Sequence, residues 1–336
     1  MKSGWRSLAG FLLSGALLLW VLRDVSPATV WAELSRSNPW LFFWATFAAT
    51  IIFPIRALRW RVILEPVAPG TPFGPLWRAT AIGMMINNVL PARAGELARA
   101  FALTREVPRV PFSTSVASLV VDRLFDAVVL LALGLVAVMD PAFPANAKIA
   151  GQPLADWALG GIALTGAMLA IVYLLVFFPR ALIVTFVIFS RRISPKLEER
   201  GRVALQRFSD GLSVMRSPRR FFLVFLWTLV HWLINGLATW LGFLAVGIDL
   251  PFSAALFVQT VTGFGVALPS APGFFGVFEA IAVLTLAVYG VSAALATSWA
   301  IGFHILTFIP ITLMGAYYFV HLGMHFRDLK AAPETR

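Results

Sequence analysis

Long apolar segments constrain this chain more than any other feature. A helix needs roughly 20 apolar residues to cross the hydrocarbon core of a bilayer. Only 13% of the 336 residues are charged and 59% are hydrophobic, against about 25% and 45–50% in soluble domains. So few polar residues cannot cover a water-soluble body of this size, and we predict an all-α integral membrane protein. Its six full spans are expected at 5–22, 39–56, 114–139, 156–178, 221–246 and 293–321.

Two further apolar stretches, 76–103 and 254–288, are interrupted in the middle. Proline removes a backbone donor and collides with the preceding helical turn, so each stretch should break there. Broken backbone at membrane depth is tolerated only where it is buried in protein or lines a wet cavity. We therefore predict two re-entrant helical hairpins, here called the first hairpin (76–103) and the second hairpin (254–288). Their expected breaks are at Pro91 and Gly95, and at Pro269, Pro272, Gly273 and Gly276.

The distribution of basic residues predicts the orientation. Segment 179–220 carries ten Lys and Arg residues, which the positive-inside rule assigns to the cytoplasm. Counting outward from it, loops 56–78 and 104–113 are cytoplasmic, and loops 23–38 and 140–155 are external. Both termini are then cytoplasmic. This assignment requires the first hairpin to enter and leave on the cytoplasmic side, and the second hairpin on the external side.

The order of elements predicts two membrane repeats. Residues 1–140 contain two spans, a hairpin and a span, and residues 156–325 contain the same order. Segment 141–155 is the external loop between them, and 326–336 is a cytoplasmic tail. An odd number of crossings inverts the second repeat. Interrupted segments in matching places of two halves are typical of transporters whose site lies near the midplane.

Ionisable side chains at membrane depth are the main functional candidates. Each costs about 2.5–3.5 kcal/mol at a helix centre on insertion scales, so these groups should pair with one another or face water. The polar breaks supply two amides in addition. The candidate head-group-binding residues are Asn87, Asn88, Arg93, Glu96, Arg99, Asp122, Arg123, Asp126 and Glu279.

Each candidate also has a structural interpretation. Arg93 and Arg99 either bind phosphate near a helix start or form internal salt bridges. Asp122, Arg123 and Asp126 either belong to the site or clamp the first hairpin to the following span.

The remaining candidates leave similar alternatives. Glu96 either neutralises an arginine or meets a cationic head group or a proton. Glu279 has no basic neighbour in sequence, which favours a functional role. Asn87 and Asn88 either cap the broken helix or bind a head group. His304 and Gln259 stand alone and are assigned to hydrogen bonds between helices.

Composition excludes several classes of protein. The chain has no cysteine, which excludes disulfides and thiolate-bound metals, and its four histidines are too scattered for a usual zinc site. The net charge of +11 lies in short segments between spans, where membrane topology and anionic lipid explain it better than nucleic acid. No Walker motif is present. We expect no metal, no cofactor and no nucleic-acid partner.

Three ordered motifs resemble the lysylphosphatidylglycerol synthase transmembrane region family. They are Asn87-Asn88-x-Leu90-Pro91-x-Arg93-x-Gly95-Glu96-x-x-Arg99, Asp122-Arg123-x-x-Asp126 and Leu268-Pro269-x-x-Pro272-Gly273-x-x-Gly276-x-x-Glu279. The resemblance implies a bacterial or archaeal inner-membrane protein that moves or exports lipids. The substrates it implies are an anionic or aminoacylated phospholipid, a glycolipid carrier or a hopanoid. Because the sequence ends at Arg336, we do not expect the aminoacyl-transferase activity of the full-length synthases.

The sequence therefore favours a lipid flippase that is not an enzyme, with Arg93, Glu96, Arg99, Asp126 and Glu279 lining one groove. Two alternatives remain. One is a membrane-embedded enzyme acting on a lipid-linked substrate with Glu96 and Glu279 as acid and base, and the other is a secondary transporter of a small solute. A homo-oligomer or a partner lipid-synthesising enzyme is compatible with each.

Overall fold

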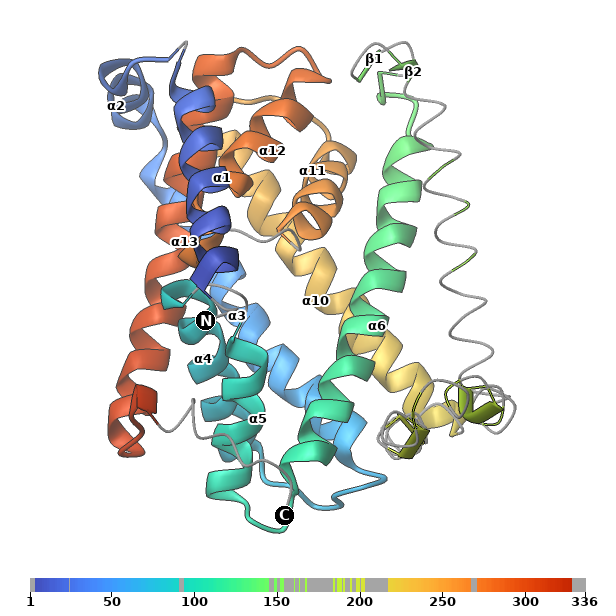
Figure 1. The fold of residues 1–336 in the computed structure, drawn as a ribbon. Helices are drawn as coiled ribbons and strands as arrows, with labels where there is room; N and C mark the ends of the chain where they lie inside the picture. Colours follow the sequence, from blue (N-terminus) through green and yellow to red (C-terminus); the bar gives the residue numbers. More distant parts are fainter. Residues whose placement is uncertain are drawn as a thin grey trace.

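The computed structural model describes residues 4–23, 25–90, 94–144, 217–266 and 271–327, with short stretches between 148 and 202. Long helices dominate it (Figure 1). In chain order the elements are α1 (Gly4–Leu22), α2 (Pro27–Arg36), α3 (Pro39–Leu64), α4 (Phe73–Val89), α5 (Gly95–Glu106), α6 (Phe112–Val138), β1 (Lys148–Ile149), β2 (Gln152–Pro153), α10 (Pro218–Ala245), α11 (Phe252–Gly265), the 3-10 turn η2 (Pro272–Phe274), α12 (Val277–Ala287) and α13 (Ala293–His321). The two short strands pair antiparallel.

Three of the described helices, α3, α10 and α13, are long and apolar enough to cross a membrane. A fourth candidate is the pair formed by residues 11–22 of α1 and the whole of α2, which meet at an angle of 72°. Helix α6 has 27 residues and carries three charged side chains, at 122, 123 and 126, within its apolar sequence. The helical membrane class is thus confirmed. The predicted span 156–178 and most of segment 179–220 lie outside the described residues.

The second predicted span ends too early. Helix α3 continues past Arg56 to Leu64, and both Arg56 and Arg59 are buried inside the protein. Hydropathy stops a span at its first arginine because it assigns each charge a cost and ignores partners. Here the two arginines meet carboxylates of α6, as described below, so the assignment of residues 56–60 to a cytoplasmic loop was wrong.

Helix α2 was not predicted, because 23–38 was assigned to a loop. Its start has a local cause that the sequence contains. Ser26 accepts a hydrogen bond from the Thr29 amide at 3.1 Å, and Pro27 occupies the first turn. A serine cap followed by proline is a common helix start. Helix α2 packs against α13.

Both interrupted stretches form antiparallel helix pairs. In the first hairpin, α4 and α5 touch closely at two glycines. A Cβ on Gly95 would lie 2.0 Å from the Gly83 carbonyl oxygen, so only glycine permits this approach. In the second hairpin, a Cβ on Gly265 would lie 1.9 Å from the Ile281 side chain. Helices α4 and α5 occupy the lower half of the view in Figure 1, and α11 and α12 the upper half.

The packing between elements follows a regular pattern. The first hairpin packs on α13 through α4, and the second hairpin packs on α6 through α11. Helix α5 also touches α6, just as α12 touches α13, and α3 packs along α10. Each hairpin therefore lies against the helix that closes the other half of the chain.

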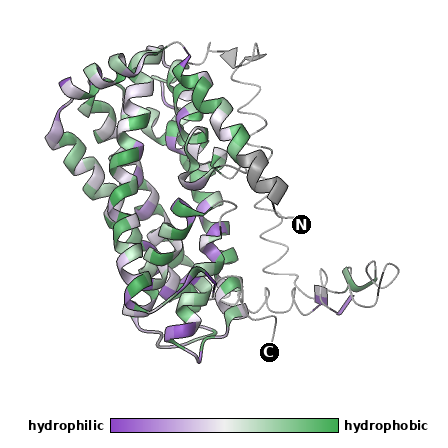
Figure 2. Ribbon diagram, turned by 60° about the vertical axis from the view of Figure 1, so that its left-hand side comes forward, coloured by the Kyte–Doolittle hydropathy of each residue, from purple (hydrophilic) through white to green (hydrophobic). Residues whose placement is uncertain are grey.

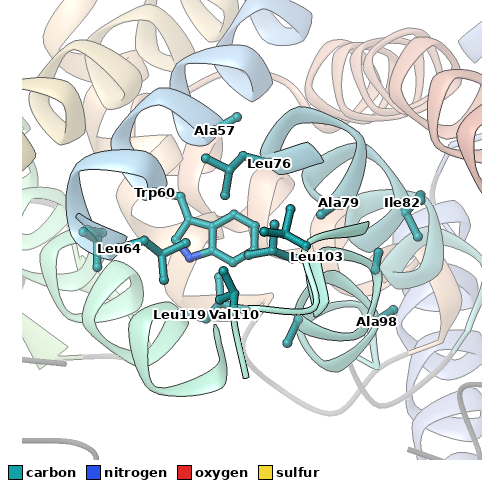
Figure 3. Packing of buried hydrophobic residues seen from close by; sticks show 14 of the residues in the cluster. Ala57, Trp60, Leu64, Leu76, Ala79, Ile82, Ala98, Leu103, Val110 and Leu119 are labelled. Atoms are coloured by element: carbon teal, nitrogen blue, oxygen red, sulfur yellow. The ribbon is translucent and has the colours of Figure 1, made fainter. Parts of the chain in front are cut away.

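The largest apolar cluster surrounds Trp60 (Figure 3). Its indole is fully buried and donates a hydrogen bond to Ser118 Oγ at 2.7 Å, which ties α3 to α6. Large apolar side chains also remain exposed on the outer helix faces, among them Trp40, Phe43, Leu313 and Val320. Figure 2 shows that hydrophobic residues predominate along the long helices. Exposed apolar belts of this kind suit contact with lipid rather than water.

Candidate functional site

Seven ionisable side chains from three helices form one network of ion pairs. We call them the buried charge cluster. They come from α3, α5 and α6, and comprise Arg56, Arg59, Glu96, Arg99, Asp122, Arg123 and Asp126. Four guanidiniums face three carboxylates, which leaves a net charge of +1.

Arg59 lies at the centre of the cluster and is completely buried. One of its terminal nitrogens donates to Asp126 Oδ1 at 2.6 Å, and the other lies 2.6 Å from Asp122 Oδ1. The first nitrogen also donates to Thr228 Oγ1 at 3.1 Å. Because Asp122 and Asp126 are one helical turn apart, a single guanidinium can bind both carboxylates. Arg59 thus joins α3 to α6 and α10.

Two further arginines share the remaining oxygen of Asp122. Arg99 Nη1 lies 3.4 Å from Asp122 Oδ2, and Arg56 Nη2 lies 3.9 Å from the same atom. The Arg99 guanidinium also lies over the Trp60 ring, 4.1 Å from its centre, in a cation–π arrangement. Both arginines are buried. A single carboxylate oxygen therefore offsets two adjacent positive charges.

The fourth arginine forms the outer edge of the cluster. Arg123 pairs with Glu96 of α5 and lies 3.2 Å from Asp126 Oδ2. Its side chain is 40% exposed and that of Glu96 is 30% exposed. The pairs Glu96–Arg123 and Arg99–Asp122 clamp the first hairpin to α6, which is the structural alternative considered for these residues.

Glu279 lies in the second hairpin and belongs to a different polar group. One carboxylate oxygen accepts the Gly276 amide hydrogen at 2.6 Å, and the other lies 2.6 Å from His304 Nδ1. The imidazole stacks on Phe275, with ring centres 4.5 Å apart. The structure thus gives Glu279 a partner from α13 that sequence spacing did not reveal, and it brings His304 into a contact between helices as predicted.

The amides and glycines at the breaks mostly hold the hairpins together. Asn87 Oδ1 accepts the amide hydrogen of Gly95 at 2.8 Å, which satisfies the first turn of α5. Asn88 Nδ2 donates to Thr312 Oγ1 on α13 at 2.7 Å. Gly273 and Gly276 have positive φ angles of 67° and 84°, and Pro272 begins η2. The predicted residues Pro91, Arg93 and Pro269 lie outside the described residues.

A cavity of about 250 Å³ lies between the two hairpins. Its lining residues come from α3, α4, α10, α11, η2, α12 and α13, and we call it the central cavity. Aromatic and aliphatic side chains form most of its wall. In the part of the chain that the structure describes, its polar lining consists of amides, hydroxyls and one imidazole, from Asn88, Asn235, Thr239, Gln259, Thr262, His304 and Thr307.

The central cavity and the buried charge cluster are neighbours separated by two side chains. Met84 lines the cavity, and its sulfur accepts a hydrogen bond from Arg56 Nη1 at 3.8 Å. Trp232 also lines the cavity and donates its indole hydrogen to Asp126 Oδ1 at 3.1 Å. Glu96, Arg99, Asp126 and Glu279 are not among the residues that line this cavity, and Arg93, the fifth residue of the predicted groove, lies outside the described residues.

Sequence reasoning missed Arg56, Arg59, Trp232 and the cavity amide Asn235 as parts of the site. Arg56 and Arg59 were recognisable in principle, since their i, i+3 spacing places them on one helical face. Asn235 shares a helical face with His231 and was assigned only to hydrogen bonds between helices, and Trp232 carried no sequence signal. Among the described residues, no group of three or more His, Asp and Glu side chains could hold a metal ion.

Comparison with known proteins places this chain in a family. Residues 7–315 match the family described as the lysylphosphatidylglycerol synthase TM region. A UPF0104 membrane protein of Methanothermobacter thermautotrophicus is 28% identical in an alignment of 303 positions that covers 86% of this chain and 86% of that protein. Another UPF0104 membrane protein of that organism is 25% identical over 334 residues, covering 92% of this chain and 91% of the relative.

A third relative has a longer chain. The glycosyltransferase AglD of Haloferax volcanii is 26% identical in an alignment of 318 positions that covers 87% of this chain but 50% of that protein. These relatives are archaeal. Because the family match spans most of the sequence and the long helices are apolar, this chain belongs to the lysylphosphatidylglycerol synthase TM region family of multi-pass membrane proteins.

Proposed function

We propose that the protein moves a polar-headed lipid between the two leaflets of the cytoplasmic membrane. The observation that carries this proposal is the central cavity, which is lined from both hairpins and from three long helices. Its volume of about 250 Å³ is just below the range of about 300–1,000 Å³ for whole-ligand pockets. It suits a head group whose acyl chains remain in the bilayer.

The proposed architecture is an inverted repeat of residues 1–140 and 156–325 with two re-entrant hairpins. The packing pattern supports it. Exchanging α3, α4, α5 and α6 for α10, α11, α12 and α13 reproduces the same set of contacts among these eight helices. In such folds the substrate site lies between the repeats, and rocking of one repeat against the other alternates access.

The proposed orientation places both termini in the cytoplasm. Helix α2 and the β1–β2 pair, from the two loops predicted to be external, lie at the same end of the molecule (Figure 1). The connection between α5 and α6, predicted to be cytoplasmic, lies at the other end. This grouping agrees with the asymmetry of basic residues.

The proposed substrate is a membrane lipid. The family name and the apolar wall of the cavity support this class. Because the Haloferax volcanii relative is named a glycosyltransferase, we include a glycolipid among the candidate substrates. The other candidates are anionic and aminoacylated phospholipids and hopanoids. We propose that the chain acts as a transporter rather than an enzyme, alone, as a homo-oligomer or beside a lipid-synthesising partner.

Leaflet exchange in proteoliposomes tests the proposal. Fluorescent phosphatidylglycerol, phosphatidylethanolamine and a glycosylated diacylglycerol are compared for the natural protein and Asn235→Leu. The substitution replaces the cavity amide of Asn235 with an aliphatic side chain of similar size. We expect exchange of the preferred lipid to fall about tenfold, which corresponds to about 1.4 kcal/mol. Thr50→Val is the matched control, because its hydroxyl bonds its own helix at Thr46.

Three results would redirect the proposal. Exchange no faster than in protein-free vesicles for all three lipids would contradict broad lipid translocation. Chemical conversion of a probe lipid during the same incubation, detected by thin-layer chromatography, would favour the enzyme alternative. Exchange that falls equally in Asn235→Leu and Thr50→Val would show that the cavity is not the path.

A further inference from the structure

Arg56 is a buried guanidinium whose pairing is incomplete. Its Nε and Nη2 atoms have no hydrogen-bond partner among the residues that the structure describes. Its remaining nitrogen donates to the Met84 sulfur, which is a weak acceptor. The nearest carboxylate oxygen, Asp122 Oδ2, is 3.9 Å from Nη2. Because Arg56 is only 7% exposed, bulk water does not supply the missing partners.

Arg99 has the same deficiency on the other side of Asp122. Its Nε and Nη2 atoms also lack hydrogen-bond partners in the described part of the chain, and the residue is 3% exposed. Two guanidiniums therefore flank one carboxylate oxygen. Together they contain four nitrogen atoms that have no hydrogen-bond partner among the described residues. Buried charges are retained only when they are paired and hydrogen-bonded. A second anion would complete this arrangement.

The central cavity provides the route to Arg56. Met84 both lines the cavity and contacts Arg56. Its side chain can rearrange, because methionine is unbranched and has three rotatable bonds. Rotation of its thioether would exchange a weak sulfur acceptor for an oxygen of a ligand without moving the backbone. An oxyanion is the favoured replacement, because hydrogen bonds from arginine to phosphate are short and frequently bidentate.

We propose that Arg56, supported by Arg99, is an anion site for a phosphate or phosphodiester group, and that Met84 is the gate between this site and the central cavity. The proposal rests on the proposed function and adds its substrate chemistry: a phosphate-bearing head group occupies the cavity with its phosphate against Arg56. The same chemistry suits a lipid phosphodiester and free inorganic phosphate.

Calorimetric titration of the purified protein in detergent tests this site without any leaflet exchange. The probes are dihexanoylphosphatidylglycerol, inorganic phosphate and the uncharged dihexanoylglycerol. We expect the natural protein to bind the phosphate-bearing lipid. Arg56→Gln should weaken that binding about tenfold or more, the effect of losing charge-assisted hydrogen bonds. Arg56→Lys should restore part of it. Arg61→Gln, an exposed arginine on the same helix, should leave it unchanged.

The Met84→Leu variant distinguishes two interpretations of Arg56. In one, Arg56 is an anion site that Met84 gates, and in the other its role is only structural. Leucine removes the competing sulfur, so we expect this variant to bind the lipid at least as tightly as the natural protein. Weakening as large as in Arg56→Gln would overturn the gate. Inorganic phosphate that binds as tightly as the lipid would identify free phosphate as the ligand, whereas tighter lipid binding identifies the head group.

Two results would overturn the anion site itself. One is the absence of binding for both phosphate-bearing probes. The other is unchanged affinity in Arg56→Gln, provided that the variant elutes as a folded particle. Failure of leaflet exchange together with Arg56-dependent phosphate binding would instead reject the proposed translocation and leave the anion site standing.

Discussion

Glu279 and His304 form a buried pair that connects the second hairpin to the central cavity. The Glu279 Oε1 atom lies 2.6 Å from His304 Nδ1, across 25 positions of sequence. The other carboxylate oxygen caps the first turn of α12 through the Gly276 amide. His304 lines the cavity, so Glu279 acts on the cavity by fixing this imidazole and the start of α12.

Substitutions at Glu279 should distinguish how much each of these two contacts contributes to the free energy of unfolding. Glu279→Ala removes both and leaves the Gly276 amide without its acceptor, so we expect the free energy of unfolding to fall by about 2 kcal/mol or more. Glu279→Gln keeps one carbonyl oxygen and should lose roughly half as much. Thermal unfolding in detergent, followed by circular dichroism, measures the difference. Equal losses would show that the capping contact contributes little.

Asp126→Asn should be strongly destabilising. The carboxylate accepts from Arg59 and Trp232 and also pairs with Arg123. Its removal leaves buried positive charge without compensation, a change that typically costs about 3–5 kcal/mol. The matched control is Asp249→Asn in the exposed loop before α11, which should change little. Similar melting temperatures for the two variants would contradict a structural role for the buried charge cluster.

Gly276→Ala should loosen the contact between α1 and α12. The glycine has a φ of +84°, and an added Cβ would lie 2.1 Å from the Ser14 carbonyl oxygen. Gly290 has a similar φ of +75° with nothing within 4 Å, so Gly290→Ala isolates the backbone cost of about 1–2 kcal/mol. The excess loss in Gly276→Ala reports the close approach. No excess in unfolding experiments would mean that α1 does not pack on the second hairpin in the membrane.

The absence of cysteine makes the orientation directly testable. Single cysteines at Arg109 and Asp249, both exposed, lie in loops predicted on opposite sides of the membrane. A membrane-impermeant maleimide added to intact cells should label Asp249→Cys. Arg109→Cys should react only after the membrane is opened. The reverse pattern would invert the proposed topology, and labelling of both in intact cells would reject it.

Much of the helix organisation was predictable, because it depends on local sequence. Apolar runs predicted α1, α3, α6, α10 and α13, and prolines and glycines predicted the division of both interrupted stretches. The local signal failed at the end of α3. There, Arg59 is buried only because Asp122 and Asp126 reach it from α6, and a hydropathy window contains no information about a partner 67 positions away.

The sequence alone determined the membrane class, the helices and the presence of charges that must find partners at membrane depth, because hydrophobic length and helix breaking are properties of contiguous residues. Tertiary structure decided which charges pair. It placed Arg59 between two aspartates, paired Glu279 with His304, and put Met84 and Trp232 between the central cavity and the buried charge cluster. Such contacts depend on helix packing in three dimensions, since each joins side chains that are distant in the chain.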